Sequence, residues 1–160
     1  MKKRMVYLFS LILILPGLTP PSRAAQATTQ KFNFSGPIST SIEPHPCTGE
    51  VIRLDGRFKQ IVRITEDGAG GFHMTSHIIV KGTAVGLTSG NEYVFNQESH
   101  LSMNDSQQPC QQEFTNTLHL NFISKGQGEN LVVIGVGHIT MNANCEVSAD
   151  FNHFKLECQG

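Results

Sequence analysis

The chain has 160 residues, with 12 Lys and Arg against 13 Asp and Glu. A chain of this length suits one domain with a core of its own. Four of the cations precede residue 28, so the remaining 133 residues carry eight basic and 13 acidic side chains, a net charge of −5. Nucleic-acid binding depends on Lys and Arg that neutralise phosphates, so this charge excludes nucleic acid as an expected partner.

The N-terminal segment has the layout of an export signal. Lys2, Lys3 and Arg4 precede an uncharged apolar run over residues 5–15. This run is shorter than the roughly 20 residues that a membrane-spanning helix needs. Small residues then offer a cleavage site, best after Ala27. We therefore expect residues 1–27 to be a signal peptide, and the mature protein to be secreted or periplasmic with no membrane span.

The rest of the chain divides into an arm and a β domain. Residues 28–46 are rich in Ser, Thr and Pro, which predicts a flexible N-terminal arm. Residues 47–160 alternate apolar and polar side chains in runs separated by turn residues, which predicts a single β domain. The expected strands are 50–65, 71–83, 92–103, 113–124, 131–141 and 145–158. A change of apolar parity between Phe151 and Phe154 predicts a β-bulge near Asn152 and His153.

The short connections predict an all-β fold, an antiparallel up-and-down meander of about six strands. One apolar face lies inside such a sheet, which either closes as a small barrel or stays open and curled. Helix content is expected to be small, because no stretch keeps a helical period.

The four cysteines of the mature part predict two disulfides, since an exported chain enters an oxidising compartment. In a six-strand meander, Cys47 and Cys158 lie at one end of the sheet, and Cys110 and Cys145 lie at the other. Bridged Cα atoms lie within about 7 Å, whereas a ten-residue strand spans about 33 Å. The predicted pairs are therefore Cys47–Cys158 and Cys110–Cys145.

Histidines on strand faces are the candidates for ligand binding. His73 and His77 share one face of a strand, but at this spacing they lie roughly 13 Å apart and cannot both ligate one ion directly. A metal site would need one of them with a histidine of another strand. The scattered cysteines contain no Cys-x-x-Cys pair, which disfavours a thiolate zinc site. We therefore expect neither a metal nor a cofactor.

A carboxylate beside an imidazole suits general acid–base chemistry, and Glu98 and His100 are two residues apart on one strand face. Such pairs are also common on solvated sheet faces, so no catalytic residue is assigned. The candidate ligand-binding residues are His73, His77, Glu98, His100, His119 and His138.

Three short motifs resemble those of a family of short secreted bacterial proteins without an assigned function. They are Pro-Cys-Thr-Gly-Glu at 46–50, Gly-Gly-Phe-His-x-Thr-x-His at 70–77 and Glu-Cys at 157–158. The likeness covers about residues 46–158. It implies an exported all-β domain and supplies no catalytic residue. The chain departs from the family pattern at Ile79, where an Asn is expected, and in having Cys110 and Cys145.

We expect a non-catalytic binding or envelope-associated protein, with a small molecule as its partner, because small barrels often hold one small ligand. One alternative is an enzyme that uses the face bearing His and Glu, through metal-assisted or general acid–base chemistry. Another is a purely structural envelope protein. Convergence of His and Glu in a concave pocket would favour the enzyme, whereas a dry apolar lumen would favour ligand binding.

Overall fold

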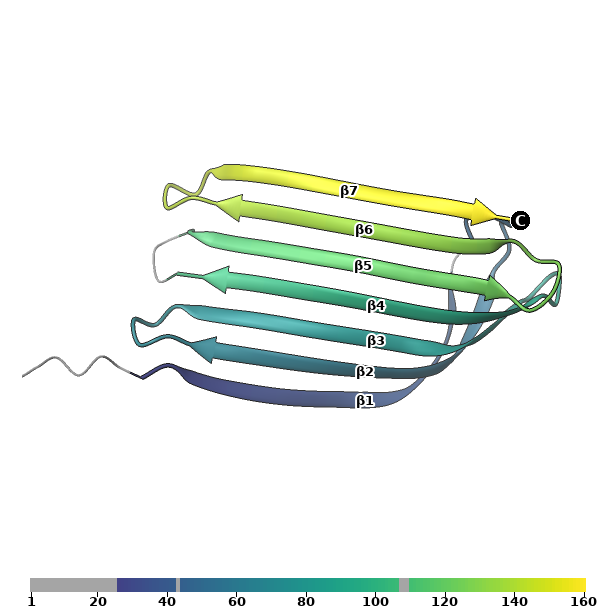
Figure 1. Cartoon of the computed structure of the whole chain (residues 1–160), viewed down its shortest axis with the longest axis horizontal. Helices are drawn as coiled ribbons and strands as arrows, with labels where there is room; N and C mark the ends of the chain where they lie inside the picture. The colour runs from purple at the N-terminus through teal and green to yellow at the C-terminus, as the bar shows by residue number, and fades with distance from the viewer. Residues whose placement is uncertain (1–25, 43, 107–109) are drawn as a thin grey trace, which may run out of the picture.

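The computed structural model describes residues 26–42, 44–106 and 110–160, which form seven strands (Figure 1). The strands are β1 (Thr28–Ile42), β2 (Ile52–Glu66), β3 (Phe72–Gly86), β4 (Glu92–Asp105), β5 (Gln112–Ser124), β6 (Asn130–Met141) and β7 (Val147–Gln159). Residues 1–25, which make up most of the expected signal peptide, lie outside the described residues.

Each strand pairs antiparallel with the next strand of the sequence, giving one sheet in the order β1 to β7. The all-β meander is therefore confirmed, with one strand more than expected. β1 and β7 are the two edges and do not pair with each other, so the sheet is open rather than closed into a barrel.

The segment that the sequence predicts to be a flexible arm is the source of the extra strand. β1 pairs with β2 over its whole length, from Thr28 opposite Glu66 to Ile42 opposite Ile52. Its Ser, Thr and Pro content misled the prediction, because Pro37 is acceptable in a strand at the edge of a sheet, where its missing N–H breaks no second ladder. The prediction of a flexible arm is thus wrong for residues 28–42.

The pleat sorts the side chains onto two faces that differ in charge. The inner face carries the core, and every Lys, Arg and His of the seven strands has the opposite parity and belongs to the outer face. The charged residues of the inner face are three carboxylates: Glu66, Asp105 and Asp150.

The core occupies one end of the inner face, which we call the closed end. Here a connection of residues 44–51, the closing loop, joins β1 to β2 and reaches the end of β7 (Figure 1). His45 of this loop is fully buried, with its ring centroid 5.5 Å from that of Tyr93 and 5.7 Å from that of Phe122. The buried apolar residues are Ile52, Leu54, Val80, Ala84, Tyr93, Phe95, Phe122, Leu131 and Val133.

Polar contacts and a disulfide fix the closing loop. The Glu50 carboxylate accepts hydrogen bonds from the backbone N–H groups of Thr88 (3.3 Å) and Ser89 (3.0 Å) and from the Ser89 hydroxyl (2.8 Å). The Ser89 backbone bond is the largest cause that lowers the pKa of Glu50 below its ordinary value. Gly49 supplies the positive φ of 73° that the turn requires. The motif at 46–50 therefore has a structural role in this chain.

Both predicted disulfides are confirmed. Cys47–Cys158, with Cα atoms 5.6 Å apart, joins the closing loop to β7. Cys110–Cys145, with Cα atoms 4.8 Å apart, joins the β4–β5 and β6–β7 connections at the opposite end of the sheet, which we call the open end. Strand direction therefore placed the cysteines as expected, because adding β1 before Cys47 does not change the direction of the six strands that follow.

The predicted bulge near Asn152 and His153 is wrong. The ladder between β6 and β7 is regular there, and its irregularity lies beside Thr140 and Met141. Phe151 and Phe154 simply point to opposite faces, and both are exposed. Because β7 is an edge strand exposed on both sides, its apolar residues are not restricted to one face.

Candidate functional site

The inner face stays apolar beyond the core, although nothing among the described residues covers it at the open end. Six large apolar residues of this face are exposed: Phe32, Phe34, Phe114, Ile139, Phe154 and Leu156. Between them lie half-buried apolar side chains of the central strands, including Ile64, Met74 and Met103. Monomeric soluble proteins rarely expose so wide an apolar surface without a use for it.

Neutral polar side chains cross this apolar surface near its middle. The Gln60 amide donates to the Ser76 hydroxyl over 3.0 Å, and the Gln97 amide donates to Ser99 over 3.4 Å. The three carboxylates of the inner face lie toward the open end, at Glu66, Asp105 and Asp150. The surface thus offers apolar contact and neutral hydrogen-bonding groups, and its only formal charge is negative.

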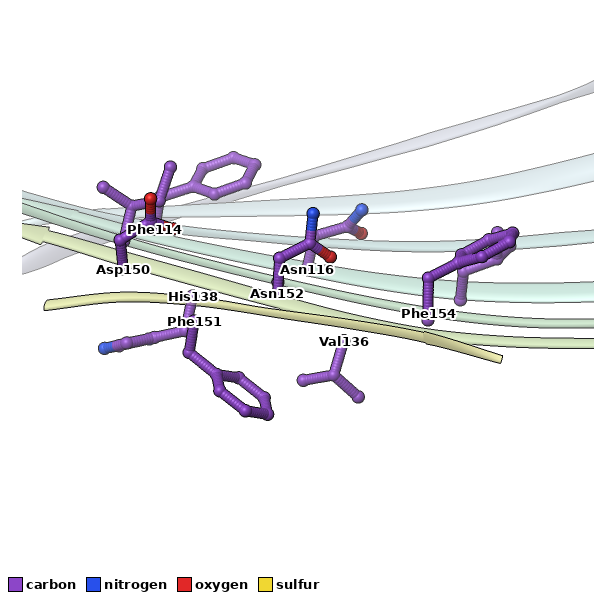
Figure 2. Close-up of a pocket in the computed structure, with 12 residues that line it drawn as sticks. Phe114, Asn116, Val136, His138, Asp150, Phe151, Asn152 and Phe154 are labelled. Carbon is purple, nitrogen blue, oxygen red and sulfur yellow. The ribbon is translucent and has the colours of Figure 1, made fainter. Parts of the chain in front are cut away.

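Two glycines hollow the inner face beside β7. A Cβ atom added at Gly137 would meet no atom within 4 Å, and one added at Gly135 would only make ordinary contact with Phe154 and Leu118. The resulting hollow has a volume of about 290 Å³. Figure 2 shows Asn116, Asn152 and Phe154 on one side of the sheet, and Val136 and Phe151 on the other.

A smaller cavity lies where the inner face meets the core. Its volume is about 140 Å³, and its lining is apolar except for one amide. The lining residues are Ile38, Leu54, Val80, Phe95, Gln97, Leu120 and Phe122. Apolar cavities of about 150 Å³ in other proteins accept small hydrocarbons such as benzene. The apolar surface therefore includes a recess that residues of β1 to β5 line.

Three of the candidate polar residues meet on the outer face. His77 on β3 lies directly opposite His100 on β4, and their rings stack with centroids 4.1 Å apart. Glu98 Oε1 lies 2.9 Å from Nε2 of His77 and 3.1 Å from Nε2 of His100. Hydrogen bonds from His100 and then His77 hold the pKa of Glu98 below its ordinary value. These residues form what we call the His77–Glu98–His100 cluster.

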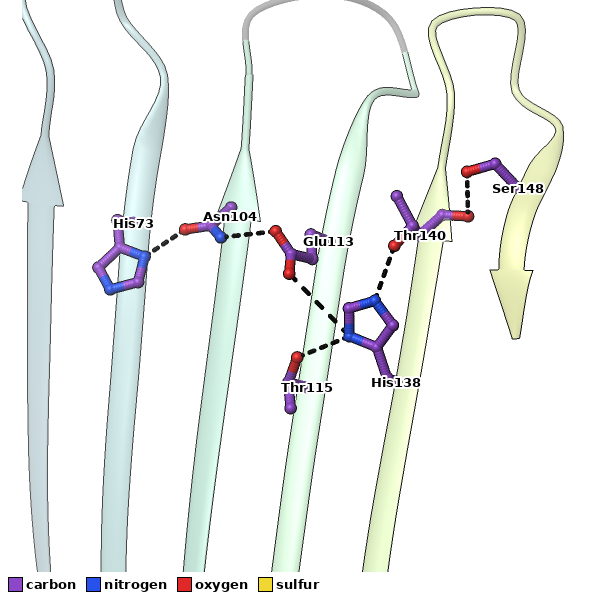
Figure 3. Close-up of polar contacts among 7 residues, drawn as sticks. All are labelled: His73, Asn104, Glu113, Thr115, His138, Thr140 and Ser148. Carbon is purple, nitrogen blue, oxygen red and sulfur yellow. Dashed lines mark hydrogen bonds and ion pairs between the residues drawn. The ribbon is translucent and has the colours of Figure 1, made fainter. Parts of the chain in front are cut away.

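Two further candidates belong to a second polar network, nearer the open end (Figure 3). His73 hydrogen-bonds Asn104, whose amide donates to Glu113 over 3.1 Å. Glu113 lies 4.0 Å from Nδ1 of His138. The His138 ring also contacts the hydroxyls of Thr115 and Thr140, each at 2.9 Å. Every ring here has hydroxyl or amide partners, so this network accounts for His73 and His138 as sheet-stabilising residues.

The sixth candidate, His119, lies on β5 directly opposite Glu98. It is exposed and has no part in the group of three ligand atoms. Cys47, Glu129 and Cys158 also bring ligand atoms together, but both sulfur atoms belong to a disulfide and cannot bind a metal as thiolates.

Comparisons with protein-family models, curated proteins and solved structures found no match. Among the described residues there is no helix long and apolar enough to cross a membrane. The geometry of the two faces therefore carries the functional assignment.

The sequence did not single out His45, which the structure buries among the core aromatics. Burial lowers the pKa of its imidazole, and this effect outweighs the nearby carboxylates of Glu50 and Glu129, which raise it. The one available signal was its place two residues before a cysteine, since a disulfide near the end of a sheet restricts where its neighbours can point.

Proposed function

We propose that this chain is an exported, non-catalytic binding protein, and that the inner face at the open end holds an apolar ligand. The main support for this proposal is the apolar surface that runs from Phe154 and Phe114 toward the recess beside Phe95. Apolar surface that is left uncovered on a folded sheet favours association with an apolar partner. The two disulfides support export, because such bonds persist in oxidising compartments.

The recess at the closed end favours a slender ligand over a second sheet. A second copy of the chain could cover the exposed rows of the open end, but a sheet cannot enter a cavity of about 140 Å³ that is lined by residues of five strands. A hydrocarbon chain can lie along the rows and insert its end there. We therefore assign the surface to an amphiphile with a hydrocarbon chain.

The charge of the inner face favours an amphiphile whose head group is neutral or cationic. Asp105 and Asp150 stand toward the open end, and the inner face of the described strands carries no Lys or Arg to pair with an anionic head. Opposite charges attract and like charges repel across such a surface, most strongly at low ionic strength. An alkylamine or alkyl alcohol should therefore bind more tightly than a carboxylate of equal chain length.

Binding of the neutral fluorophore N-phenyl-1-naphthylamine to the protein tests this proposal. Phe154 and Phe151 make a matched pair, because they lie on the same strand, on opposite faces, and are 61% and 56% exposed. We expect Phe154→Ser to weaken probe binding at least about fivefold, since an apolar side chain contributes about 1.5–3 kcal/mol when buried. Phe151→Ser should bind as the wild type does.

A second variant fills the hollow instead of removing a contact. Gly137→Leu places a side chain where a Cβ atom meets nothing, so the fold should tolerate it and probe binding should fall. Equal effects of Phe154→Ser and Phe151→Ser would contradict the assignment. Failure of the wild type to bind the probe saturably would favour the purely structural role.

A further inference from the structure

We propose that His77, Glu98 and His100 form a binding site for one divalent transition-metal ion, with zinc as the ion that best suits the ligands. The site lies on the outer face, away from the apolar surface, and it does not depend on the proposed function. Two imidazoles and one carboxylate are the protein ligands of one class of zinc site, which keeps its fourth position for water or another ligand.

The spacing of the three ligand atoms fits a single ion. Zinc binds imidazole nitrogen and carboxylate oxygen at about 2.0–2.2 Å, so two ligand atoms of a tetrahedral site lie about 3.3 Å apart. Glu98 Oε1 lies 2.9 Å and 3.1 Å from the two Nε2 atoms, and all three atoms lie within 4.8 Å of one another. The two contacts of the Glu98 carboxylate would therefore need to lengthen by only a few tenths of an ångström around an ion.

The backbone of the sheet holds the ligands in place. His77 and His100 occupy one register position of β3 and β4, and Glu98 follows two residues from His100 on the same face. Both strands are flanked by paired strands, so none of the three Cα atoms lies on an edge or in a loop. The sequence argument against a metal used the roughly 13 Å between His73 and His77. That separation stands, but the second imidazole comes from β4 instead.

The protonation states also suit metal binding. Glu98 supplies an ionised carboxylate, as glutamate ordinarily does at neutral pH. In the metal-free cluster each imidazole can donate its Nε2–H to this carboxylate. Binding an ion requires the neutral tautomer with its proton on Nδ1, so the two Nε2 atoms exchange a hydrogen bond for a coordinate bond.

The surroundings leave room for a fourth ligand. The three side chains are 30%, 46% and 56% exposed in the order His77, Glu98, His100. A hollow of about 330 Å³ borders both imidazoles and has hydroxyls of Ser and Thr in its wall. His119 stands opposite Glu98 on β5, within one strand spacing. Either a water molecule or His119 can complete the coordination.

Calorimetric titration of Zn²⁺ into the untagged, disulfide-intact chain tests the site. A polyhistidine tag must be absent because it binds the same ions. We expect one equivalent to bind, and we expect His77→Ala and His100→Ala each to weaken binding by at least about tenfold, since even residues outside the coordination shell cost 10–100-fold when they are removed. Glu98→Gln should weaken binding as well.

His73→Ala and His138→Ala are the matched controls, since each removes an imidazole from the same face but outside the cluster. Both should bind Zn²⁺ as the wild type does. Absorption of bound Co²⁺ provides a second readout, because a tetrahedral nitrogen and oxygen site gives intense visible bands that a solvated ion lacks. Loss of these bands in His119→Ala would make His119 the fourth ligand, and their retention would assign that position to water.

Two outcomes would overturn the proposal. One is the absence of saturable binding at a 1:1 ratio, which would leave the cluster as a hydrogen-bonded surface feature. The other is binding that His77→Ala and His100→Ala do not weaken but the control variants do. Circular dichroism of each metal-free variant shows whether it has folded. Probe binding at the inner face should be unchanged in all of them, which separates this test from that of the proposed function.

Discussion

The closed and open ends of the sheet share one inner face but differ in what covers it. At the closed end, His45 and its loop cover Tyr93 and Phe122, and these rings are completely or almost completely buried. Beyond the core, Phe154 near the middle of the sheet and Phe114 toward the open end occupy rows of the same face and remain exposed. Apolar composition is therefore similar along the sheet, and the closing loop decides where it becomes a core.

This contrast separates stability from binding. Residues that the closing loop covers contribute their burial to the folding free energy, whereas those of the open end remain available to a ligand. Substitutions at the closed end should thus change the free energy of unfolding, and those at the open end should change the affinity for a ligand. Four measurements examine this division, beginning with the largest expected effect.

The two disulfides should differ in their effect on stability. The chain-entropy relation assigns roughly 5 kcal/mol to a loop closed over a separation of 111 residues and roughly 4 kcal/mol to one of 35. Cys110 and Cys145 also adopt positive φ angles of 68° and 64°, which costs a residue other than glycine about 1–2 kcal/mol and offsets part of the gain. We therefore expect Cys47→Ala with Cys158→Ala to destabilise the fold more.

Urea unfolding of the two double variants measures this difference. The double variant that lacks Cys47 and Cys158 should also expose the aromatic core, which near-ultraviolet circular dichroism would detect. An equal or larger loss of stability in the double variant that lacks Cys110 and Cys145 would mean that the closed end does not depend on its disulfide.

Removal of one phenylalanine from the core and of one from the uncovered part of the inner face should give a second contrast. Phe122 is 1% exposed and packs against Phe95 and Tyr93, so Phe122→Ala should cost about 3–5 kcal/mol. Phe154 is largely exposed, and Phe154→Ala should change the free energy of unfolding by less than about 0.5 kcal/mol. Thermal or urea unfolding of both variants under one condition provides the measurement. A similar loss for both would show that the inner face beyond the core is covered in solution.

A third contrast concerns a carboxylate at each end. Glu50 accepts three hydrogen bonds from the β3–β4 turn, whereas Glu146 accepts one side-chain hydrogen bond, from Asn142, in the β6–β7 turn. Hydrogen bonds to a charged group contribute about 1.5–3 kcal/mol, so Glu50→Ala should cost an amount of this order. Glu146→Ala should cost clearly less. Equal losses in urea unfolding would show that Glu50 does not hold the closing loop.

The sequence predicted the strands and the disulfides because both follow from local alternation and strand direction. It missed β1 because Pro37 and the Ser and Thr residues around it are tolerated at an edge, where pairing occurs on one side only. It paired Glu98 with His100 on one strand face but could not assign His77 to the same cluster. Which residues face each other across β3 and β4 depends on the register, and a one-residue change in register would separate them.

The closing loop was the least predictable part, because its fold depends on partners far away in the sequence. Glu50 finds its donors in the turn before β4, and Cys47 finds its partner at the end of β7. No periodicity within residues 44–51 indicates such contacts. The burial of His45 follows only once these contacts are known.

That burial gives the smallest of the four expected effects, a dependence of stability on pH. Burial lowers the pKa of His45 below its ordinary value of 6.5, despite the opposing charges of Glu50 and Glu129. The unfolded chain therefore takes up a proton at a higher pH than the folded one does. Stability from this group is complete above about pH 6.5 and decreases as the pH falls from there toward the folded pKa.

Replacement of the imidazole isolates this contribution. His45→Phe keeps an aromatic ring against Tyr93 and Phe122 but cannot be protonated, so the loss of stability on going from pH 7.5 to pH 5 should be smaller than in the wild type. Urea unfolding at several pH values measures the difference. Hydrogen exchange shows where the acid-induced opening begins. Protonation of His45 should increase exchange at amides of the closing loop before it does so at amides of the open-end turns. An unchanged pH dependence in His45→Phe, or acid-induced exchange that begins at the open end, would contradict a closed end sealed by a neutral imidazole.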